Sequence, residues 1–276
     1  MSSPQPIPLR RRSGPVLATV TGTKLITPQL RRVHLIAPEL FTGRSVPTAA
    51  WVRGFFPLDP AGVPGPSGKT GPVGAAAGPA AGSESSAAAR AYTLVDFDPE
   101  TGRFALDFVL HEHGPAARWA AQAEAGQVLR VAGPLGRGRV EQQHQRYFLA
   151  GDLTALPAIR QWLIALPATV AVQAHIWSPS SLEHQELPTA EGWNVAWHYG
   201  TEGNWADLAE RGELAPPGWH PDQPDVKFFI AGEAGLVTRA RRAIAMAGRP
   251  LPGNLHAAGY WRSGGTGDPA ALERLR

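Results

Sequence analysis

Arg90, Tyr92 and Thr93 bring together three side chains with complementary binding chemistry. An arginine guanidinium can hold a phosphate group through two parallel hydrogen bonds. Successive side chains point to opposite faces of a strand, so the tyrosine could stack on a planar ring while the threonine offers a hydroxyl. Gly114-Pro115 then follows a second strand and begins a helix, whose first-turn N–H groups attract anions. These features together predict a diphosphate cradle, and the alternative is an ordinary hairpin followed by an ordinary helix.

Two glycine turns form a second candidate site, because each directly follows a short apolar run. One begins with Gly151 and Asp152, and the other with Gly232 and Glu233. In parallel α/β sheets ligands lie beyond the C-terminal ends of the strands, so a dinucleotide could lie across both turns with its phosphates near Thr154. Neither turn has the full G-x-G-x-x-G spacing. The alternative is that the glycines serve the backbone and that the acidic residues cap helices.

Residues at two other strand ends could also contact a ligand. His111 and His113 alternate at one strand end, with Asp107 on the same face as His111. A pair of histidines can bind zinc, but no third ligand of the right type is evident nearby, and we expect no metal site. Trp261 ends the last expected strand, where an aromatic ring can cover a planar cofactor or fill the core.

The composition limits the classes of function. The chain has 276 residues, 43% of them hydrophobic, which suggests two domains with real cores. Its formal net charge is only +3 and no stretch densely interleaves basic and aromatic residues, so we expect no nucleic-acid partner. The absence of cysteine excludes disulfides, thiolate metal sites and iron–sulfur clusters. No apolar run is long enough to span a membrane, and no apolar segment of a signal peptide follows the arginines at 10–12, so we expect a cytoplasmic protein.

The first half of the chain has the pattern of a small antiparallel β-barrel, with short strands bounded by turn residues. Large apolar side chains recur every second residue from Phe104 to Leu110, which is the period of a half-buried strand. At 61–89, 24 of the 29 residues are glycine, alanine, proline or serine, so we expect a flexible insertion that buries too little apolar surface to become ordered. Residues 1–14 are expected to be disordered. Strands are expected at 16–23, 31–37, 51–56, 90–93, 103–111 and 128–132.

The pattern changes after about residue 145, where short apolar strands alternate with helices. This alternation indicates a parallel α/β sheet. We therefore expect a barrel domain over 15–143 and an α/β domain over 144–276. Strands are expected at 147–150, 169–177, 195–197, 227–231 and 255–261, with helices that end near 166 and 247.

The motifs, taken in their order along the chain, resemble those of the siderophore-interacting protein family. This family comprises FAD-dependent NAD(P)H ferric-siderophore reductases of the ferredoxin-reductase-like superfamily. The segments that match are RAYT, DFVLHEHGPAARWA, GDLTALPA, FIAGEA and GYWR, and the resemblance runs from about residue 16 to residue 262. It implies an N-terminal antiparallel FAD-binding β-barrel followed by a parallel-sheet NAD(P)H-binding α/β domain.

The resemblance also implies roles for individual residues. Arg90 would hold an FAD phosphate, and Tyr92 and Thr93 would contact the flavin and its ribityl chain. The chain departs from the family pattern at Val95, where an arginine is usual, and at Ala117, where a hydroxyl residue is common. The further positions assigned to cofactor binding are His111, Gly114, Ala116, Ala117 and Trp119 on the FAD side, and Gly151, Asp152, Thr154, Ala155, Gly232 and Glu233 on the nicotinamide side, with Trp261 as a further contact.

We therefore expect a flavin-dependent oxidoreductase that reduces a ferric siderophore and releases Fe(II), with electrons from NADH or NADPH passing through FAD. Trp197 is followed by His198, and not closely by the arginine common in the family, so the choice of nicotinamide cofactor stays open. Many ferric siderophores are anionic, so Arg53, Arg130 and Arg262 are candidates for lining a substrate cleft. The alternatives are a reductase of free flavin or of a redox protein, and a flavin- or siderophore-binding protein without turnover. We expect a monomer with no nucleic-acid or membrane partner.

Overall fold

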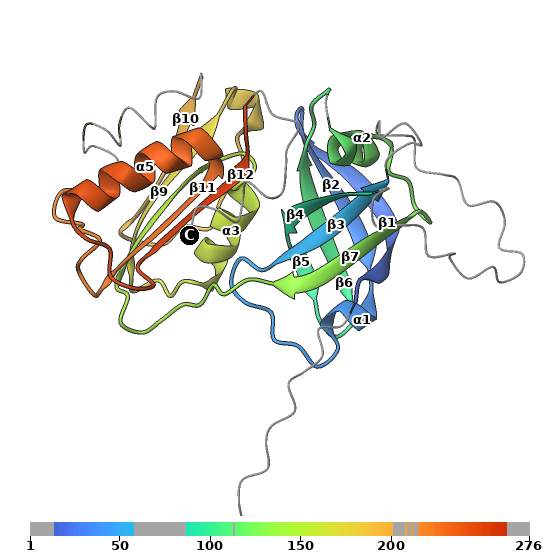
Figure 1. Cartoon of the computed structure of the whole chain (residues 1–276), viewed down its shortest axis with the longest axis horizontal. Helices are drawn as coiled ribbons and strands as arrows, with labels where there is room; N and C mark the ends of the chain where they lie inside the picture. The colour runs from blue at the N-terminus through green and yellow to red at the C-terminus, as the bar shows by residue number, and fades with distance from the viewer. Residues whose placement is uncertain are drawn as a thin grey trace, which may run out of the picture.

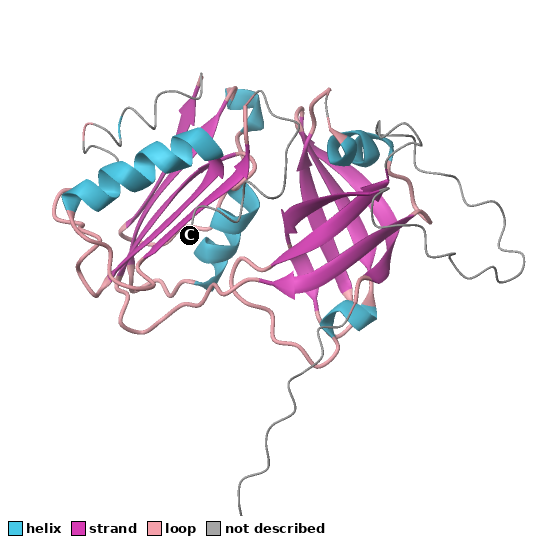
Figure 2. Cartoon of the chain, viewed as in Figure 1, coloured by secondary structure: helices cyan, strands magenta, loops and turns pink. Residues whose placement is uncertain are grey.

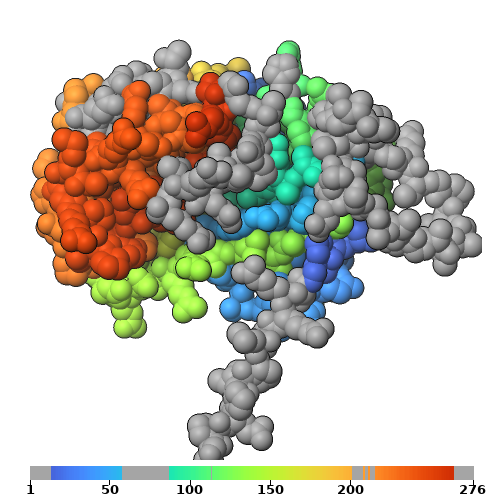
Figure 3. Space-filling model, viewed as in Figure 1, coloured from blue at the N-terminus to red at the C-terminus, as the bar shows by residue number. Residues whose placement is uncertain are grey.

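The computed structural model describes residues 14–57, 87–112, 114–200, 208, 211 and 215–263. It contains an antiparallel sheet from the first half of the chain and a parallel sheet from the second half (Figure 1). In the space-filling view the blue-to-green first half and the yellow-to-red second half adjoin each other (Figure 3). The predictions made for residues 1–13 and 58–86, and for His113, lie outside the described residues.

The antiparallel sheet, with its two helices, is called the barrel unit below. Its seven strands curl like a barrel that does not close, and no ladder among the described residues joins the end strands β4 and β5 (Figure 1). The second strand alternates as a half-buried strand should, because Val33 and Leu35 are buried while Arg32 and His34 are only partly so. The order across the sheet is β4 (Ala87–Thr93), β3 (Trp51–Pro57), β7 (Val128–Leu135), β1 (Val16–Thr27), β2 (Leu30–Ile36), β6 (Arg103–Val109) and β5 (Val95–Asp98).

Helices α1 (Pro38–Phe41) and α2 (Pro115–Gln122) lie at opposite ends of the barrel unit (Figure 2). The inner apolar side chains of the strands form one core cluster, and Trp119 of α2 belongs to it. Because α2 is amphipathic, it buries this face against β3, β4 and β6.

Several boundaries in the barrel unit differ from the prediction: β1 runs on to Thr27, β6 ends at Val109, and α1 and β5 were not predicted. The sequence predicts that β7 ends at 132, but it runs through Gly133-Pro134 to Leu135. Pro134 is tolerated because it falls where the β3–β7 ladder shifts register, so its missing N–H breaks no regular pair. β4 begins at Ala87, inside the segment expected to be a flexible insertion, because its first three residues pair with the end of β3.

The parallel sheet and its helices are called the α/β unit. Phe148 and Leu149 are neighbours in β8 but belong to different apolar clusters, which α5 (Ala234–Ala247) and α3 (Leu156–Ala165) cover on opposite faces of the sheet (Figure 2). The predicted edge position of the last strand is confirmed. None of the described helices combines the length and apolar character needed to cross a membrane. The order is β10 (Trp193–Tyr199), β9 (Ala171–Ser178), β8 (Arg146–Asp152), β11 (Val226–Glu233) and β12 (Leu255–Trp261), and the short helix η2 (Ser181–Glu183) follows β9.

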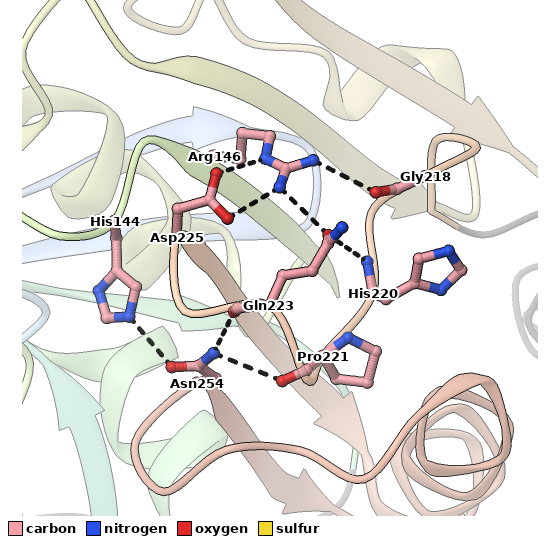
Figure 4. A network of polar contacts seen from close by, with 8 residues as sticks. All are labelled: His144, Arg146, Gly218, His220, Pro221, Gln223, Asp225 and Asn254. Atoms are coloured by element: carbon pink, nitrogen blue, oxygen red, sulfur yellow. Dashed lines mark hydrogen bonds and ion pairs between the residues drawn. The ribbon is translucent and has the colours of Figure 1, made fainter.

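A polar network ties the N-terminal ends of the parallel strands together (Figure 4). The Arg146 guanidinium donates to both carboxylate oxygens of Asp225, at 2.9 and 2.8 Å, and to the side-chain oxygen of Gln223 at 3.1 Å. The side-chain amide of Asn254 donates to the carbonyl oxygen of Gln223 at 2.6 Å, and its oxygen lies 3.2 Å from Nε2 of His144. This network braces the end of the sheet that is opposite to the candidate site.

Candidate functional site

Strand β4 carries the predicted phosphate and ring contacts at one edge of the barrel unit. Arg90 is half-buried, and its Nη1 donates to the carbonyl oxygen of Ala89 at 2.8 Å. Tyr92 is half-buried, its ring centroid lies 4.3 Å from that of Phe108, and desolvation raises the pKa of its hydroxyl. Thr93 is buried on the opposite face of the strand. The predicted alternation of the tyrosine and the threonine is therefore confirmed.

The first turn of α2 has no side-chain cap. Gly114, the N-cap, has a φ of +102°, a value that favours glycine, and it has no side chain to accept from the first-turn N–H groups. The first turn holds no acidic residue. His111 lies close by, since a Cβ added to Gly114 would be 3.2 Å from His111 Cε1. Ala116 and Ala117 are buried and offer only their backbone. The predicted helix start is confirmed, and the binding of an anion by its N–H groups stays a prediction.

Trp119 packs α2 against the barrel core beside β4. Its ring centroid lies 5.5 Å from that of Phe56 and 5.6 Å from that of Phe108. Tyr92 packs on the same two rings, at 5.7 and 4.3 Å. The indole is 3% exposed, so it fills the core, and its contact with a cofactor stays a prediction. The aromatic cluster brings the two predicted halves of the diphosphate cradle to the same part of the barrel unit.

Asp152, at the end of β8, is the point on which three segments converge. Its Oδ1 accepts from the N–H of Thr154 at 2.8 Å and from the Thr154 hydroxyl. Its Oδ2 accepts from the backbone N–H of Glu233 at 2.9 Å and from the indole N–H of Trp261 at 2.8 Å. Desolvation raises the pKa of Asp152, and the four hydrogen bonds act in the opposite direction. Asp152 pairs with Thr154 as the sequence suggests, but the N-cap of α3 is Ala155, so the carboxylate does not cap that helix.

Glycine is required at positions 151 and 232, because other atoms lie where a Cβ would be. A Cβ at Gly151 would lie 2.5 Å from both the Ala155 Cβ and the carbonyl oxygen of Ala231. A Cβ at Gly232, which has a φ of +141°, would lie 2.5 Å from Oδ2 of Asp152. The backbone explanation for both glycines is confirmed, and the binding of a dinucleotide across them stays a prediction.

Glu233 caps helix α5, as the sequence alternative proposes. Its Oε2 accepts from the N–H of Leu236 at 2.8 Å. Its Oε1 accepts from the N–H of Ser263 at 3.2 Å, which fixes the chain directly after β12. The same residue therefore positions the start of a helix and the end of the edge strand.

Tyr260 joins the α/β unit to the barrel unit at this site, and it was not among the predicted site residues. Its hydroxyl lies beside the side chain of Thr93. Desolvation raises the pKa of Tyr260, and the negative charge of Asp152 raises it further. The only available signal was its place beside Trp261 in the GYWR segment. This contact places the end of β12 against the RAYT motif.

Two of the three arginines proposed for a substrate cleft lie together. The Arg130 guanidinium carbon stands 4.6 Å from the ring centroid of Phe55, and Arg53 is exposed on the same face of β3. In the ladder Arg53 pairs with Ala91, so this face is opposite to that of Arg90. The third arginine, at 262, is exposed after the end of β12. A role of these arginines in substrate binding stays a prediction.

A histidine pair in the α/β unit was not predicted. His175 Nδ1 lies 2.8 Å from Nε2 of His198, and the His198 ring stacks on Trp177 with centroids 4.5 Å apart. Burial lowers the pKa of His175 to about 4, with a smaller contribution from His198, and burial also lowers the pKa of His198. Both rings are therefore neutral at pH 7. The cluster depends on the pairing of β9 with β10, which no local pattern specifies.

Within the described parts of the chain, no group of three or more histidine, cysteine, aspartate or glutamate side chains is placed to hold a metal ion. Asp107, which the sequence places on the same face as His111, is instead buried in an ion pair with Arg32 at 2.7 Å. Its carboxylate is thereby committed to a contact within the sheet.

Two family models match the chain. The siderophore-interacting FAD-binding domain matches residues 19–138, and the siderophore-interacting protein model matches residues 144–264. Among solved structures, the siderophore-interacting protein SipS from Aeromonas hydrophila superposes with a TM-score of 0.74 at 28% sequence identity, and the match covers 94% of both chains.

Some of the curated relatives are much longer than this chain, which matches only a part of them. The chain is 30% identical over 254 residues to the mycobactin import ATP-binding/permease protein IrtA of Mycolicibacterium smegmatis, which covers 90% of this chain and 26% of that protein. It therefore spans about a quarter of the length of this relative. It is 26% identical over 178 residues to the ferric vibriobactin reductase ViuB of Vibrio cholerae, which covers 63% of this chain and 65% of the relative. The two matched models and the shared ferredoxin-reductase-like fold show that the chain belongs to the siderophore-interacting protein family.

Proposed function

We propose that the chain is a flavin-dependent reductase of ferric siderophores that takes electrons from NADH or NADPH. One observation carries the proposal: the two sets of predicted cofactor residues meet across the two units. Thr93 of the barrel unit lies beside the hydroxyl of Tyr260, and the indole of the adjacent Trp261 donates to Asp152 at 2.8 Å. A reductase of this kind needs its flavin beside its nicotinamide, and this contact brings the corresponding motifs together.

The residues around β4 and α2 fit FAD. The Arg90 guanidinium and the uncapped N–H groups after Gly114 suit a diphosphate. The half-buried ring of Tyr92 offers an aromatic face, and the hydroxyl of Thr93 is a hydrogen-bonding group for the polar chain of the cofactor. When bound, FAD would accept a hydride from the nicotinamide and pass single electrons to Fe(III). The protein would bind and orient the cofactor.

The residues of the glycine turns would form the nicotinamide side. Asp152 holds the hydroxyl and N–H of Thr154 and the indole of Trp261 in fixed positions through its two carboxylate oxygens. The close packing at Gly151 and Gly232 keeps the ends of β8 and β11 adjacent. A planar ring that enters here would meet preorganised groups, which reduces the entropy lost on binding.

The ferric siderophore is proposed as substrate because of family membership and the likeness to a ferric vibriobactin reductase. Reduction favours release, because hard oxygen ligands hold Fe(III) more tightly than Fe(II). Arg53 and Arg130, which flank Phe55, offer positive charge and an aromatic surface to an anionic chelate. The monomeric state and the cytoplasmic location expected from the sequence stay predictions.

The visible spectrum of the purified protein tests the proposal. We expect a bound flavin spectrum that bleaches on anaerobic addition of NADH or NADPH and returns on addition of a ferric siderophore. Formation of Fe(II) is followed in parallel with a ferrous-specific chelating dye. A protein that takes up no FAD refutes the cradle. A yellow protein that neither nucleotide bleaches favours a flavin- or siderophore-binding protein without turnover.

A further inference from the structure

Glu183 of η2 is a buried carboxylate that reaches from the α/β unit into the turn between β1 and β2 of the barrel unit. It is 1% exposed. Its two oxygens lie 3.1 and 3.3 Å from the backbone nitrogen of Gln29, which donates to them, and the Thr27 hydroxyl donates to Oε2. These partners lie 154 and 156 positions away in the sequence and in the other unit.

This contact forms only when the barrel unit and the α/β unit hold the relative position seen in the structure. A carboxylate removed from water without partners is strongly unfavourable, whereas hydrogen bonds to a charged acceptor are stronger than those between neutral groups. The ion pairs found among the described residues do not include Glu183, so the two barrel-unit donors compensate its burial. If the β1–β2 turn moved away, the carboxylate would return to water. Interfaces between domains are typically polar and mobile, so a contact of this kind restricts their relative motion.

The α/β unit holds Glu183 in place before it meets its partners. Ser180 caps η2, since its Oγ accepts from the N–H of Leu182 at 3.1 Å. The Ser178 hydroxyl, at the end of β9, donates to the carbonyl oxygen of Ser180 at 2.8 Å. On the other side of η2, Arg160 of α3 donates to the side-chain oxygen of Gln185 at 2.9 Å. The carboxylate is therefore presented on a preorganised turn.

We propose that Glu183 is a positioning residue that fixes the relative position of the two units and thereby sets the spacing between the flavin and the nicotinamide. η2 follows the C-terminal end of β9, and the second contact between the units, Thr93 with Tyr260, lies at the C-terminal end of β12. Both contacts therefore lie at the C-terminal end of the parallel strands. The kinetic part of this inference rests on the proposed function, and the mechanical part does not.

Three substitutions separate positioning from general stability. Glu183→Ala removes the acceptor, whereas Glu183→Gln keeps an amide oxygen for Gln29 and an N–H for the Thr27 hydroxyl. Thr27→Val removes one donor and leaves the carboxylate. Glu186→Ala is the matched control, because Glu186 is an exposed glutamate three positions further along the chain.

The relative position of the units is measured by energy transfer between two dyes. The chain has no cysteine, so Leu17→Cys in β1 and Met246→Cys in α5 provide unique labelling sites, at side chains that are 60% and 88% exposed. We expect Glu183→Ala to broaden the distance distribution, Thr27→Val to broaden it less, and Glu183→Gln and Glu186→Ala to leave it unchanged.

The same variants are loaded with FAD and mixed anaerobically with nicotinamide in a stopped-flow instrument. We expect Glu183→Ala to retain its flavin spectrum and to bind the nucleotide within about threefold of the unmodified chain, because it touches neither group. Flavin reduction should slow by roughly tenfold or more, since displacements near 1 Å can cost about a hundredfold. The charge-transfer absorption between nicotinamide and flavin should weaken in parallel.

An unchanged distance distribution in Glu183→Ala overturns the proposal, and so does a broadened distribution with an unchanged rate of flavin reduction. If neither nucleotide reduces the flavin of the unmodified chain, the proposed function fails, and the distance measurement alone decides the mechanical part. If Glu183→Ala does not fold, Thr27→Val decides by the same two readouts.

Discussion

Gly232→Ala should destabilise the α/β unit strongly, because the new methyl group would enter the Asp152 carboxylate. The added Cβ would lie 2.5 Å from Oδ2 and 2.8 Å from Cγ of Asp152. The carboxylate cannot turn away freely, since Oδ2 accepts from the N–H of Glu233 and from the indole of Trp261. The substitution must therefore break these two hydrogen bonds or displace the end of β11.

The loss of unfolding free energy in Gly232→Ala can be estimated from these contacts. Hydrogen bonds to a charged group contribute about 1.5–3 kcal/mol each, and the lower value suits a half-buried site such as Asp152. A non-glycine residue at the φ of +141° found for Gly232 adds about 1–3 kcal/mol of strain. We therefore expect the free energy of unfolding to fall by roughly 4 kcal/mol. Urea denaturation, followed by tryptophan fluorescence, measures this change.

Two controls isolate the carboxylate. Gly192 also has a positive φ, of +81°, but no atom lies within 4 Å of its added Cβ, so Gly192→Ala reports backbone strain alone. In an Asp152→Ala background the added methyl at position 232 meets no carboxylate, and we expect its further cost to shrink by about 2 kcal/mol or more. The reasoning is refuted if Gly232→Ala costs no more than Gly192→Ala, or if its cost is the same with and without Asp152.

Three further predictions concern other parts of the molecule. Arg90→Ala should lose bound FAD on gel filtration, because the phosphate loses its cationic partner, and a variant that stays fully yellow contradicts the cradle. Folding lowers the pKa of His175 from 6.5 to about 4, so the unfolded chain binds the proton more tightly and stability should fall as the pH drops from 6.5 toward 4. That loss of unfolding free energy, at most about 3 kcal/mol, is measured by urea titrations at pH 7 and pH 4.5 and should be absent from His175→Gln. An equal loss in the two proteins would contradict the prediction. Asp107→Asn should cost the barrel unit about 3 kcal/mol in thermal or urea unfolding, because it breaks a pair with Arg32 in which the carboxylate is 3% exposed, and a loss below about 1 kcal/mol would contradict this.

Much of the local structure was predictable because its causes are local. The burial of Val33 and Leu35 follows from the period of a strand, and the start of α2 follows from Gly114-Pro115. The half-buried strand predicted from Phe104 to Leu110 is wrong in its burial, because residues 104–108 are buried on both faces and Asp107 is paired there with Arg32. The ordered set of motifs was sufficient to indicate the family. The boundaries that were wrong, such as the end of β7 beyond Pro134, depended on a register shift against a strand almost eighty positions earlier.

The candidate site was predictable only in its parts. Asp152 and Trp261 were each singled out, but their hydrogen bond joins residues 109 positions apart. Glu183 carried no signal at all, because an isolated glutamate in a polar loop has the pattern of a solvated residue. Only the assembled interface shows that it is 1% exposed and bonded to the other unit.

The sequence by itself indicated most of the strands and helices, though not α1, β5 or η2, together with the glycine turns that follow strands and the motifs that indicate a flavin and a nicotinamide. Spacing and residue type act over a few neighbouring positions, so these features are local. The tertiary structure alone decided the strand orders, the convergence on Asp152, the contact of Thr93 with Tyr260 and the seat of Glu183. These contacts join residues more than eighty positions apart, and their partners are chosen by sheet order and packing, which no local pattern records.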